Sequence, residues 1–491
     1  MTFRRTKIVA TMGPACDRPN VLEQLILAGM NVARLNFSHG SADEHRHRAA
    51  LIRQLAAKHG RHVALLGDLQ GPKIRISRFT DGKVEVASGA HFTFSLSHPK
   101  DAGTAERVCI DYPGLVTDCN VGDELLLDDG RIVMKVEEVT TDSLECRVLV
   151  GGTLSNHKGI NKRGGGLTAP ALTDKDREDI LLAAELELEY IAVSFPRDAA
   201  DMHLARQLCR EAGSNAWLMA KIERAEAVMN DEVLTGLIEA SDAVMVARGD
   251  LGVEIGDAEL VGIQKKIIAT SRRYNKAVIT ATQMMESMIS SPMPTRAEVS
   301  DVANAVLDNT DAVMLSAETA AGRYPVEAVE AMARICLGAE KSPSMRSSSH
   351  RIGREFGRQD ESIALASMYI ANHLPGVKAI IALTESGHTP LVMTRIRSTI
   401  PVYAFASTPV TQARVALFRG VETIPFNPTA QPPEQVGNAA INELVSRGVV
   451  QAGDWVILTM GDIHHCVGCT NTMKVLQVEP DSSQCDKGSR P

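Results

Sequence analysis

The sequence lacks any apolar run long enough to cross a bilayer, which argues against a membrane-spanning protein. It also lacks an excess of basic residues. Sixty acidic against 52 basic residues give a net charge of −8, so the basic field that would hold nucleic acid is absent. The basic residues near the start precede only a short apolar stretch, which favours a strand over a signal peptide. We therefore expect a cytoplasmic protein that binds neither membrane nor nucleic acid, and whose anionic ligands are held by local charge.

Cysteine is scarce, and its count of nine is odd. Without a secretory signal, these residues are expected to be reduced thiols. His464, His465, Cys466 and Cys469 lie close together in the chain. A lone Cys-x-x-Cys without a second ligand pair is a weak zinc signal, so ordinary thiols in a loop are favoured. No Walker phosphate-binding motif is present either, and the three consecutive glycines at residues 164–166 are interpreted as a hinge.

What the chain does have is length and the composition of a globular protein. Its 491 residues are 44% hydrophobic and 23% charged, which predicts two to four packed domains. Short apolar runs alternate with amphipathic helical stretches over most of the length. The strand candidates are Lys7–Thr11, 31–35, 63–68, 190–194, Trp217–Ile222, Ala243–Ala247, Ala277–Ala281 and Ala312–Leu315. Eight βα units predict a (β/α)8 TIM barrel, with a doubly wound open sheet of the same units as the alternative.

The βα rhythm is interrupted once and gives way once to a new pattern. Residues 70–169 carry period-two patterns and the turn Asp128-Asp129-Gly130, which predicts an inserted β-barrel lid domain. The catalytic barrel is then formed by residues 1–69 and 170–342. Residues 343–480 predict a C-terminal open-sheet α/β domain that binds an effector. The last residues, 481–491, are small and polar, and are expected to be disordered.

Charged side chains gather where the predicted barrel strands end, which is where active sites of such barrels lie. Lys221 and Glu223 alternate along one strand and therefore point to the same side, a pattern that an ordinary ion pair would also produce. Asp250 follows the next strand. Two carboxylates from neighbouring strands suit Mg²⁺, which completes its shell with water and substrate oxygens. The sequence thus predicts a divalent metal site.

Cations from distant parts of the chain are predicted at the rim or in the lid. They are Arg34, Lys73, Arg75, Lys158 and Lys221. Each alone is more often a solvated surface residue than a ligand. Together with a metal site they indicate phosphoryl transfer, because that reaction depends mainly on positive charge placed around the moving group.

At these residues the sequence resembles pyruvate kinases, and more narrowly the bacterial type II. The stretches that carry the resemblance are residues 6–14 (TKIVATMGP), 29–40 (GMNVARLNFSHG), 67–75 (GDLQGPKIR), 245–254 (MVARGDLGVE), 281–288 (ATQMMESM) and 315–320 (LSAETA). The similarity runs from about residue 4 to 479. It implies a homotetrameric glycolytic enzyme that transfers the phosphoryl group of phosphoenolpyruvate to ADP, giving pyruvate and ATP.

The resemblance also implies residue roles. Arg34 and Lys221 contact the transferring phosphoryl group, and Gly249, Asp250 and Thr282 contact the substrate. Thr282 and Ser316 lie near the route of proton delivery, and Glu223 and Asp250 hold Mg²⁺ or Mn²⁺. The implied nucleotide contacts are Asn36, Phe37, Ser38, His39, Arg75 and Lys158. The implied K⁺ site consists of Asn36, Ser38, Asp68 and the backbone carbonyl of Leu69.

Two positions modify this picture. Many members have glutamate where this chain has Lys73, and those members need K⁺, so we expect activity here without added K⁺. In the last domain, Thr384, Ser386, Gly387, His388 and Thr389 resemble a phosphorylated-effector site. Glu385 stands where fructose 1,6-bisphosphate-binding relatives tend to have lysine, so a sugar monophosphate or AMP is the expected effector. A plain helix cap would explain the same residues.

Two other functions are compatible with the barrel pattern. A Mg²⁺-dependent lyase or aldolase acting on pyruvate-like acids would need neither Arg75 and Lys158 nor the long lid. A non-catalytic metabolite sensor would have no reason to keep Lys221, Glu223 and Asp250 together.

Overall fold

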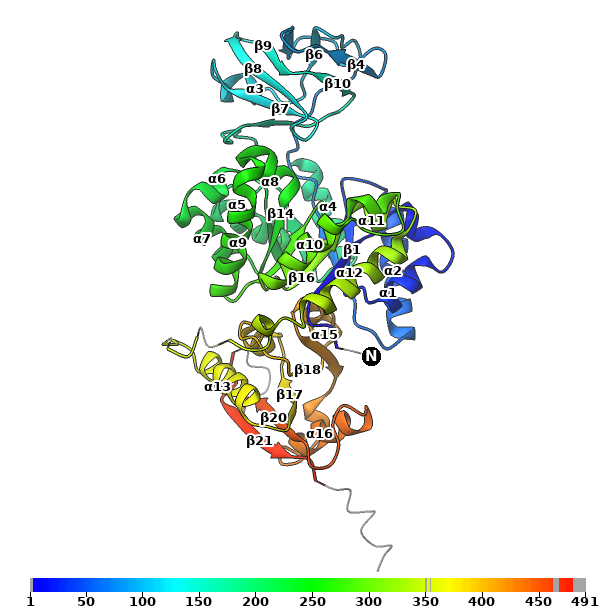
Figure 1. Cartoon of the computed structure of the whole chain (residues 1–491), viewed down its shortest axis with the longest axis vertical. Helices are drawn as coiled ribbons and strands as arrows, with labels where there is room; N and C mark the ends of the chain where they lie inside the picture. The colour runs from blue at the N-terminus through cyan, green and yellow to red at the C-terminus, as the bar shows by residue number, and fades with distance from the viewer. Residues whose placement is uncertain (1–2, 349–350, 354, 462–467, 480–491) are drawn as a thin grey trace, which may run out of the picture.

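The computed structural model describes residues 3–348, 351–353, 355–461 and 468–479. Figure 1 shows three bodies along the long axis: the β-rich insert at the top, the helix-wrapped barrel in the middle and the C-terminal sheet at the bottom. Within these ranges, no helix combines the length and the apolar character needed to span a bilayer.

Eight parallel strands close into a barrel in the order β1-β16-β15-β14-β13-β12-β3-β2, which confirms the barrel and excludes the open sheet. They are β1 (Lys7–Thr11), β2 (Val32–Asn36), β3 (Ala64–Asp68), β12 (Tyr190–Val193), β13 (Trp217–Ile222), β14 (Ala243–Ala247), β15 (Ala277–Ala281) and β16 (Ala312–Leu315). Most of their residues are buried on both faces, as expected for a parallel sheet whose outer side is covered by helices.

Helices surround the barrel and begin where side chains cap them. Ser41, Thr173 and Thr295 form capping boxes with Glu44, Asp176 and Glu298, which satisfy backbone N–H groups at the first turns of α2, α4 and α10. The helices of the barrel are α1 (Val21–Ala28), α2 (Ala42–Lys58), α4 (Asp174–Glu185), α5 (Ala199–Glu211), α6 (Glu226–Met229), α7 (Asp231–Ala240), α8 (Arg248–Ile255), α9 (Asp257–Arg273), α10 (Arg296–Leu307), α11 (Ala317–Ala320) and α12 (Pro325–Ala339).

The insert between β3 and α4 is built from strands, as predicted, and one short helix. Its elements are β4 (Lys83–Val86), β5 (His91–Ser95), β6 (Arg107–Cys109), α3 (Gly114–Asp118), β7 (Glu124–Leu127), β8 (Ile132–Val139), β9 (Ser143–Val150), β10 (Gly152–Ser155) and β11 (Ile160–Lys162). Their hydrogen bonds form a six-stranded and a two-stranded sheet around one core. Asp128, Asp129 and Gly130 all have positive φ angles, which makes the predicted tight turn between β7 and β8.

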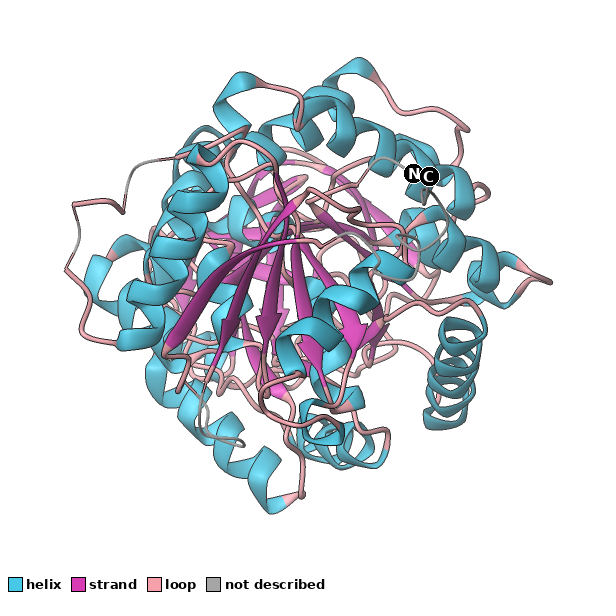
Figure 2. Ribbon diagram, turned by 90° about the horizontal axis from the view of Figure 1, so that it is seen from below, coloured by secondary structure: helices cyan, strands magenta, loops and turns pink. Residues whose placement is uncertain are grey.

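The C-terminal part is an α/β sheet in the order β19-β18-β17-β20-β21, in which only β21 is antiparallel. Its elements are α13 (Gln359–His373), β17 (Val377–Leu383), α14 (His388–Met393), β18 (Val402–Ala406), α15 (Pro409–Arg414), β19 (Val421–Pro425), α16 (Val436–Ser446), β20 (Trp455–Met460) and β21 (Thr472–Gln477). Seen from below, these strands lie in front of the barrel with helices around them (Figure 2). The fold class predicted from the sequence is therefore confirmed.

The barrel interior and the C-terminal sheet share one hydrophobic core. Val9 and Ile279 from barrel strands belong to the same buried cluster as Ile380 and Phe418 of the C-terminal part. The Tyr190 hydroxyl also donates a hydrogen bond to the Arg414 carbonyl at 2.7 Å. The strands of the insert and of the C-terminal sheet lie inside the predicted ranges 70–169 and 343–480, whose limits stay a prediction. The predicted disordered tail, 481–491, lies outside the described residues.

Candidate active site

The barrel rim brings together polar side chains that come from four consecutive strands of the ring. Arg34 lies in β2, Asp68 ends β3, Ser194 follows β12, and Lys221 lies near the end of β13. Because successive residues of a strand point to opposite sides, Lys221 lies on the same side as buried Met219, which belongs to the barrel interior. The interior is therefore apolar below and charged at the rim.

Asp68 is the centre of this charged group. Its side chain is 1% exposed and lies 2.6 Å from Arg34 Nε and 3.2 Å from Lys221 Nζ. Arg34 also donates through Nη1 to Thr11 Oγ1 at 3.0 Å. Burial alone would raise the pKa of Asp68, but the two cations outweigh it and hold that pKa below its usual value. Asp68 thus stays ionised and fixes the positions of both cations.

Lys221 makes three contacts that fix its ammonium group. Its Nζ donates to Ser194 Oγ at 2.7 Å and lies 3.0 Å from Glu223 Oε1, in addition to Asp68. Burial tends to lower the pKa of Lys221, but the carboxylates of Asp68 and Glu223 outweigh burial and raise it. A permanently charged ammonium at a fixed position is suited to stabilise negative charge on a ligand.

Glu223 and Asp250 form the carboxylate pair predicted to bind a metal ion. Glu223 is buried and accepts the Phe195 N–H at 2.9 Å, while Asp250 lies in the first turn of α8. Burial and the neighbouring charge of Asp250 raise the pKa of Glu223, against the effect of Lys221. Two carboxylates that repel each other in this way suit a divalent cation, so the donor set fits Mg²⁺. Among the described residues, no group of three or more such ligands occurs.

Lys73 reaches this pair from the insert. Its Nζ lies 3.0 Å from Asp250 Oδ1. The lysine therefore contacts a predicted metal ligand, whereas the oxygens of the predicted K⁺ site are engaged elsewhere. Asp68 pairs with Arg34 and Lys221, the Leu69 carbonyl accepts the Ser194 hydroxyl at 2.6 Å, and Asn36 Oδ1 accepts the Ser38 N–H at 3.2 Å.

Thr282 lies in a strained turn beside α8. Thr282 and Gln283 both have positive φ angles, +66° and +52°, which are costly for residues other than glycine. Thr282 Oγ1 accepts the Gly249 N–H at 2.8 Å. The Arg248 guanidinium holds the turn by donating to the carbonyls of residues 281, 282 and 283. The predicted substrate contacts Gly249 and Thr282 are thus adjacent, and their backbone is locked.

The predicted nucleotide contacts fall into two groups. Asn36 ends β2 on the barrel, and Phe37, Ser38 and His39 follow it; the Phe37 side chain is buried and its carbonyl accepts Lys175 Nζ at 2.9 Å. Arg75 and Lys158 lie in the insert. Arg75 Nη1 donates to the His157 carbonyl at 3.0 Å, and Lys158 Nζ lies 2.5 Å from Asp128 Oδ1. The structure therefore brings together the members of each group.

The insert returns to the barrel through contacts with the residues that follow Glu223. Arg224 Nη1 donates to the Leu167 carbonyl at 2.7 Å, and Glu226 accepts the Gly166 N–H. Glu254 accepts the Ala225 N–H at 2.8 Å and the Asn161 side chain at 3.2 Å. Burial raises the pKa of Glu254 to about 7. The insert is thus fastened directly beside the charged rim.

Two further predicted groups come from other parts of the chain. Ser316 follows β16, and its N–H donates to Glu318 Oε2 at 2.7 Å. In the C-terminal sheet, Thr384, Ser386, His388 and Thr389 line one pocket. Gly387 lies in the same loop and donates its N–H to Thr384 Oγ1 at 2.9 Å.

The cysteines require one correction. Among the described residues, six are free, as expected, and all six are buried, but Cys469 is disulfide-bonded, so the expectation that all are reduced is wrong. The sequence did not predict this disulfide, because Cys466 and Cys469 were interpreted as ordinary thiols in a loop. His464, His465 and Cys466 lie outside the described residues. That these residues form a loop with ordinary thiols and not a zinc site therefore stays a prediction.

Two residues of the site were missed from the sequence. Ser194 follows the fourth strand, and inspecting that strand end like the others would have found it. Arg248 was passed over in favour of Asp250, although it comes directly after β14. Its role depends on carbonyls 33 or more residues away in the chain, which no local pattern indicates.

Comparisons with known proteins match most of the chain. The family model for the pyruvate kinase barrel domain matches residues 3–329, and that for the pyruvate kinase α/β domain matches residues 361–476. The chain is 57% identical over 477 residues to pyruvate kinase II of Salmonella typhimurium, covering 97% of this chain and 99% of that protein. It is 56% identical over 459 residues to a pyruvate kinase of Haemophilus influenzae, covering 94% and 96%. The crystal structure of a pyruvate kinase from Cryptosporidium parvum has a TM-score of 0.88 at 34% identity, covering 96% of each chain.

Proposed function

The chain belongs to the pyruvate kinase family, in its bacterial type II branch, and from this premise we propose how its residues transfer the phosphoryl group of phosphoenolpyruvate to ADP. The protein is a phosphotransferase. The observation that carries the residue assignment is the fixed ammonium of Lys221, held between Ser194, Asp68 and Glu223 at 2.7–3.2 Å. A rigid cation at the rim matches the need of phosphoryl transfer for charge that is already in place.

Arg34 and Lys221 bind the transferring phosphoryl group in this proposal. Both are held by Asp68, so they need no rearrangement when negative charge builds up on the equatorial oxygens. Gly249 and Thr282 orient the rest of the substrate. Their backbone is fixed by the hydrogen bond from Arg248 to the Thr282 carbonyl and by the one from the Gly249 N–H to Thr282 Oγ1.

Glu223 and Asp250 would hold Mg²⁺ or Mn²⁺. When bound, the ion offsets negative charge on the substrate and on the enolate left after transfer. The chain's own part is to present both carboxylates ionised. Because the pKa of Glu223 is raised, acidification should weaken metal binding sooner than for an ordinary glutamate.

Protonation of the enolate carbon completes the reaction, and we assign it to the Thr282 side of the site. The Thr282 hydroxyl accepts from Gly249 N–H and donates to the Ala281 carbonyl at 2.7 Å, so it can orient a water molecule. Ser316 directly follows β16, and Thr282 directly follows β15, which is paired with β16. The two hydroxyls therefore border the same part of the rim.

The nucleotide is bound between the barrel loop 36–39 and the insert. Arg75 and Lys158 supply positive charge from the insert for the phosphates of ADP or ATP. Closure of the insert over the rim then excludes water, which would otherwise take the phosphoryl group. Lys158 must exchange Asp128 for the nucleotide during this step.

Lys73 replaces K⁺ in this protein. Its ammonium group lies next to Asp250 and supplies a fixed positive charge in place of the monovalent ion that members with glutamate at this position need. The test is pyruvate formation from phosphoenolpyruvate, ADP and Mg²⁺ in K⁺-free buffer. We expect turnover within about twofold of that with K⁺, and we expect Lys73→Glu to become K⁺-dependent. Lys83→Glu, on an exposed strand of the insert, is the control for the change in charge. A strict K⁺ requirement of the unmodified protein would contradict the assignment.

The same assay separates the alternatives. A lyase or aldolase would form pyruvate from its acid substrate without ADP, and a sensor would form none. Pyruvate formation that requires ADP and is lost in Lys221→Met supports phosphoryl transfer by the proposed residues.

The pocket of the C-terminal sheet is the proposed effector site, and a phosphorylated metabolite is the proposed effector. Thr384, Ser386 and Thr389 contribute hydroxyl groups to it, which suit phosphate oxygens. Glu385 also lines the pocket, and its negative charge disfavours a second phosphate. We expect a sugar monophosphate or AMP to lower the half-saturating phosphoenolpyruvate concentration. Strongest activation by fructose 1,6-bisphosphate would refute this choice.

We also propose a cytoplasmic homotetramer, as the family implies. Val261, Met293 and Val299 are exposed apolar side chains on or beside α9 and α10, which is consistent with a subunit contact there. Light scattering on the purified chain, at concentrations from about 0.1 to 10 μM, would measure the number of subunits in the assembly.

A further inference from the structure

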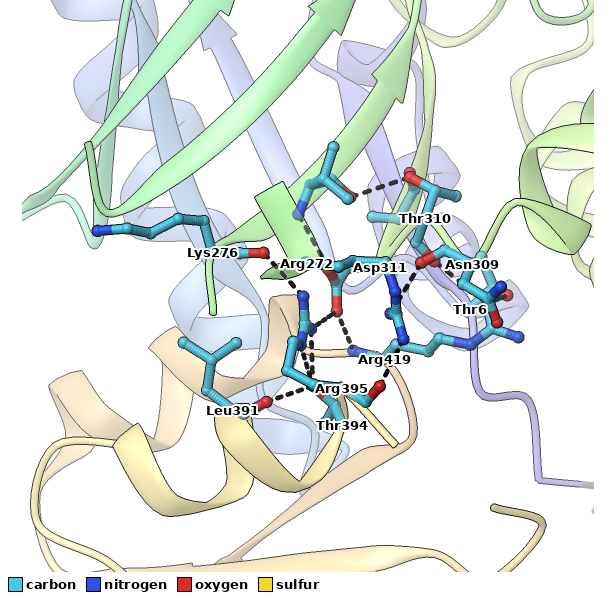
Figure 3. A network of polar contacts seen from close by, with 12 residues as sticks. Thr6, Arg272, Lys276, Asn309, Thr310, Asp311, Leu391, Thr394, Arg395 and Arg419 are labelled. Atoms are coloured by element: carbon cyan, nitrogen blue, oxygen red, sulfur yellow. Dashed lines mark hydrogen bonds and ion pairs between the residues drawn. The ribbon is translucent and has the colours of Figure 1, made fainter. Parts of the chain in front are cut away.

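A cluster of buried arginines lies where the barrel meets the C-terminal sheet (Figure 3). Arg5, Arg272, Arg351, Arg395 and Arg419 are each less than 10% exposed. We call these five residues the arginine junction. Two buried carboxylates, Asp311 and Glu340, contact its members. The described residues of the junction therefore hold more positive than negative charge.

The two carboxylates are already used by close partners. Asp311 Oδ1 pairs with Arg395 Nη2 and accepts the Arg419 N–H at 3.3 Å, while Oδ2 accepts the Val278 N–H at 2.9 Å. Glu340 accepts the backbone N–H groups of Arg5 and Thr6 at 3.0 and 2.6 Å. Each carboxylate is thus shared between backbone N–H groups and guanidinium groups.

Two members of the junction, Arg272 and Arg419, are only partly compensated. Arg272 donates only to carbonyls in the described part of the chain, those of Asn309 at 3.1 Å and Arg395 at 2.8 Å. Arg419 Nη2 is buried and has no hydrogen-bond acceptor, since Glu340 Oε1 is 3.7 Å away. A buried cation without a full set of acceptors is costly.

Proton loss cannot relieve this cost. Burial first, and the neighbouring Arg395 guanidinium second, lower the pKa of Arg272. Arginine nevertheless remains protonated in folded proteins. The remaining ways to offset the charge are the carbonyl ends of nearby helices, which carry partial negative charge, or a bound anion.

A small cavity, lined partly by apolar side chains, opens among these residues. Arg5, Arg272, Arg397, Arg419, Thr394 and Ser398 line it, and no carboxylate is among the described residues that do so. Arg397 is half-buried, unlike the other three arginines, so the cavity meets solvent on its side. The geometry thus joins a reachable space, four guanidinium groups and an unmatched donor.

We propose that this cavity binds a doubly charged tetrahedral oxyanion of the phosphate class. Guanidinium groups match phosphate oxygens through paired N–H donors, and several of them favour a dianion over chloride or a carboxylate. The ion is either free orthophosphate or the phosphoryl group of a metabolite. The site is separate from the pocket lined by Thr384 and Ser386, so it goes beyond the effector proposal.

Equilibrium dialysis of the full-length protein with labelled orthophosphate tests the proposal. Arg397→Gln and Arg419→Gln should each raise the dissociation constant for orthophosphate at least about tenfold. Arg447 is exposed and directly follows α16, and Arg447→Gln should leave this constant unchanged. Saturable binding that persists in both Arg397→Gln and Arg419→Gln, or no saturable binding at all, overturns the proposal. A sugar phosphate that displaces the label more tightly than orthophosphate identifies a metabolite as the source.

A second set of variants separates this cavity from the effector pocket. In Thr384→Val/Ser386→Ala, the phosphate binding assigned to the junction should remain. If it disappears there and persists in Arg397→Gln, the ion occupies the other pocket and the proposal fails, whatever the effector proves to be.

A built-in carboxylate gives an independent readout that does not depend on a free ligand. Ser398 lies in the cavity, and its Oγ accepts the Ile400 N–H at 3.0 Å, a bond that aspartate can keep. Ser398→Asp should raise the midpoint of thermal unfolding in phosphate-free buffer and abolish phosphate binding. A lowered midpoint would mean that helix carbonyls already compensate the arginines, and would overturn the proposal.

Discussion

At the scale of single residues, Lys221 is the side chain on which the proposed chemistry depends most. Its ammonium group is fixed by three oxygens, so we expect it to stabilise charge on the phosphoryl group without rearranging. Lys221→Met should lower kcat by about 10³-fold or more, because a preorganised charge is lost. Coupled measurement of pyruvate formation checks this. Lys221→Arg serves as the control that keeps the charge but not its position, and should recover little activity. Retention of a tenth of the activity in Lys221→Met would contradict the role.

Ser194 has a positioning role that can be measured separately. Its hydroxyl accepts from Lys221 Nζ and donates to the Leu69 carbonyl, and it therefore holds the ammonium in place. Ser194→Ala should lower kcat about tenfold while the KM for ADP changes little, because the charge remains but its position is less well defined. Ser194→Thr, which keeps the hydroxyl, should restore part of the loss. Equal losses in both variants would indicate a packing defect instead.

The identity of the charged residues could be predicted at this scale, but not their pairing. Strand ends alone led to Lys221, Glu223 and Asp250. The contact between Lys73 and Asp250 could not be foreseen, because it joins residues 177 positions apart and depends on how the insert docks. Resemblance suggested what Lys73 does, and the geometry shows which carboxylate it reaches.

At the scale of elements, the junction between insert and barrel should respond to pH. Glu254 of α8 accepts hydrogen bonds from the Asn161 side chain of β11 and from the Ala225 N–H. Arg224 and Glu226 lie nearby. Its folded-state pKa of about 7 lies above the ordinary 4.5, so the folded state binds the proton more tightly. This contribution to stability is therefore full below about pH 4.5 and is lost as pH rises through about 7, by at most about 3 kcal/mol.

Hydrogen exchange of the backbone amides at residues 160–166 is the measurement for this junction. Exchange should speed up as pH rises from 5 to 8 beyond the intrinsic base-catalysed increase. Glu254→Gln keeps an acceptor for the Ala225 N–H but cannot ionise, so the excess pH dependence should vanish in it. An unchanged pH dependence in this variant would show that another group, such as Glu226, controls the junction.

Elements were predictable where one pattern dominated the local sequence. The barrel strands are continuous apolar runs buried on both faces, and β14 was assigned residue for residue. By contrast, β21 was not assigned. Its six residues are all half-buried or exposed, so no alternation of apolar and polar residues marks it, and only pairing with β20 makes it a strand. Strands of this kind are specified by their neighbours.

At the scale of the whole molecule, the barrel and the C-terminal sheet behave as one packed unit. Their buried side chains form a single cluster, and Arg395 from the segment after α14 reaches Asp311 directly before β16. The sequence predicted both parts but not this contact, since a charged residue such as Asp311 or Arg395 is usually exposed. Both side chains are 0% exposed here, so burial of the pair depends entirely on how the two parts pack.

This buried pair offers a test of how charge is balanced across the molecule. Removing either partner normally costs about 3–5 kcal/mol, because the other charge is left uncompensated. The junction holds an excess of guanidinium groups, so the two losses should differ. Asp311→Asn removes scarce negative charge, whereas Arg395→Met also relieves repulsion with Arg272. Urea unfolding should therefore show Asp311→Asn to be the more destabilised variant by about 1 kcal/mol or more. The double variant should be less destabilised than the sum of the two single variants, since the interaction can be lost only once. Equal losses, or strict additivity, would mean that the helix carbonyls balance the junction and that the carboxylate of Asp311 is not what holds the two parts together.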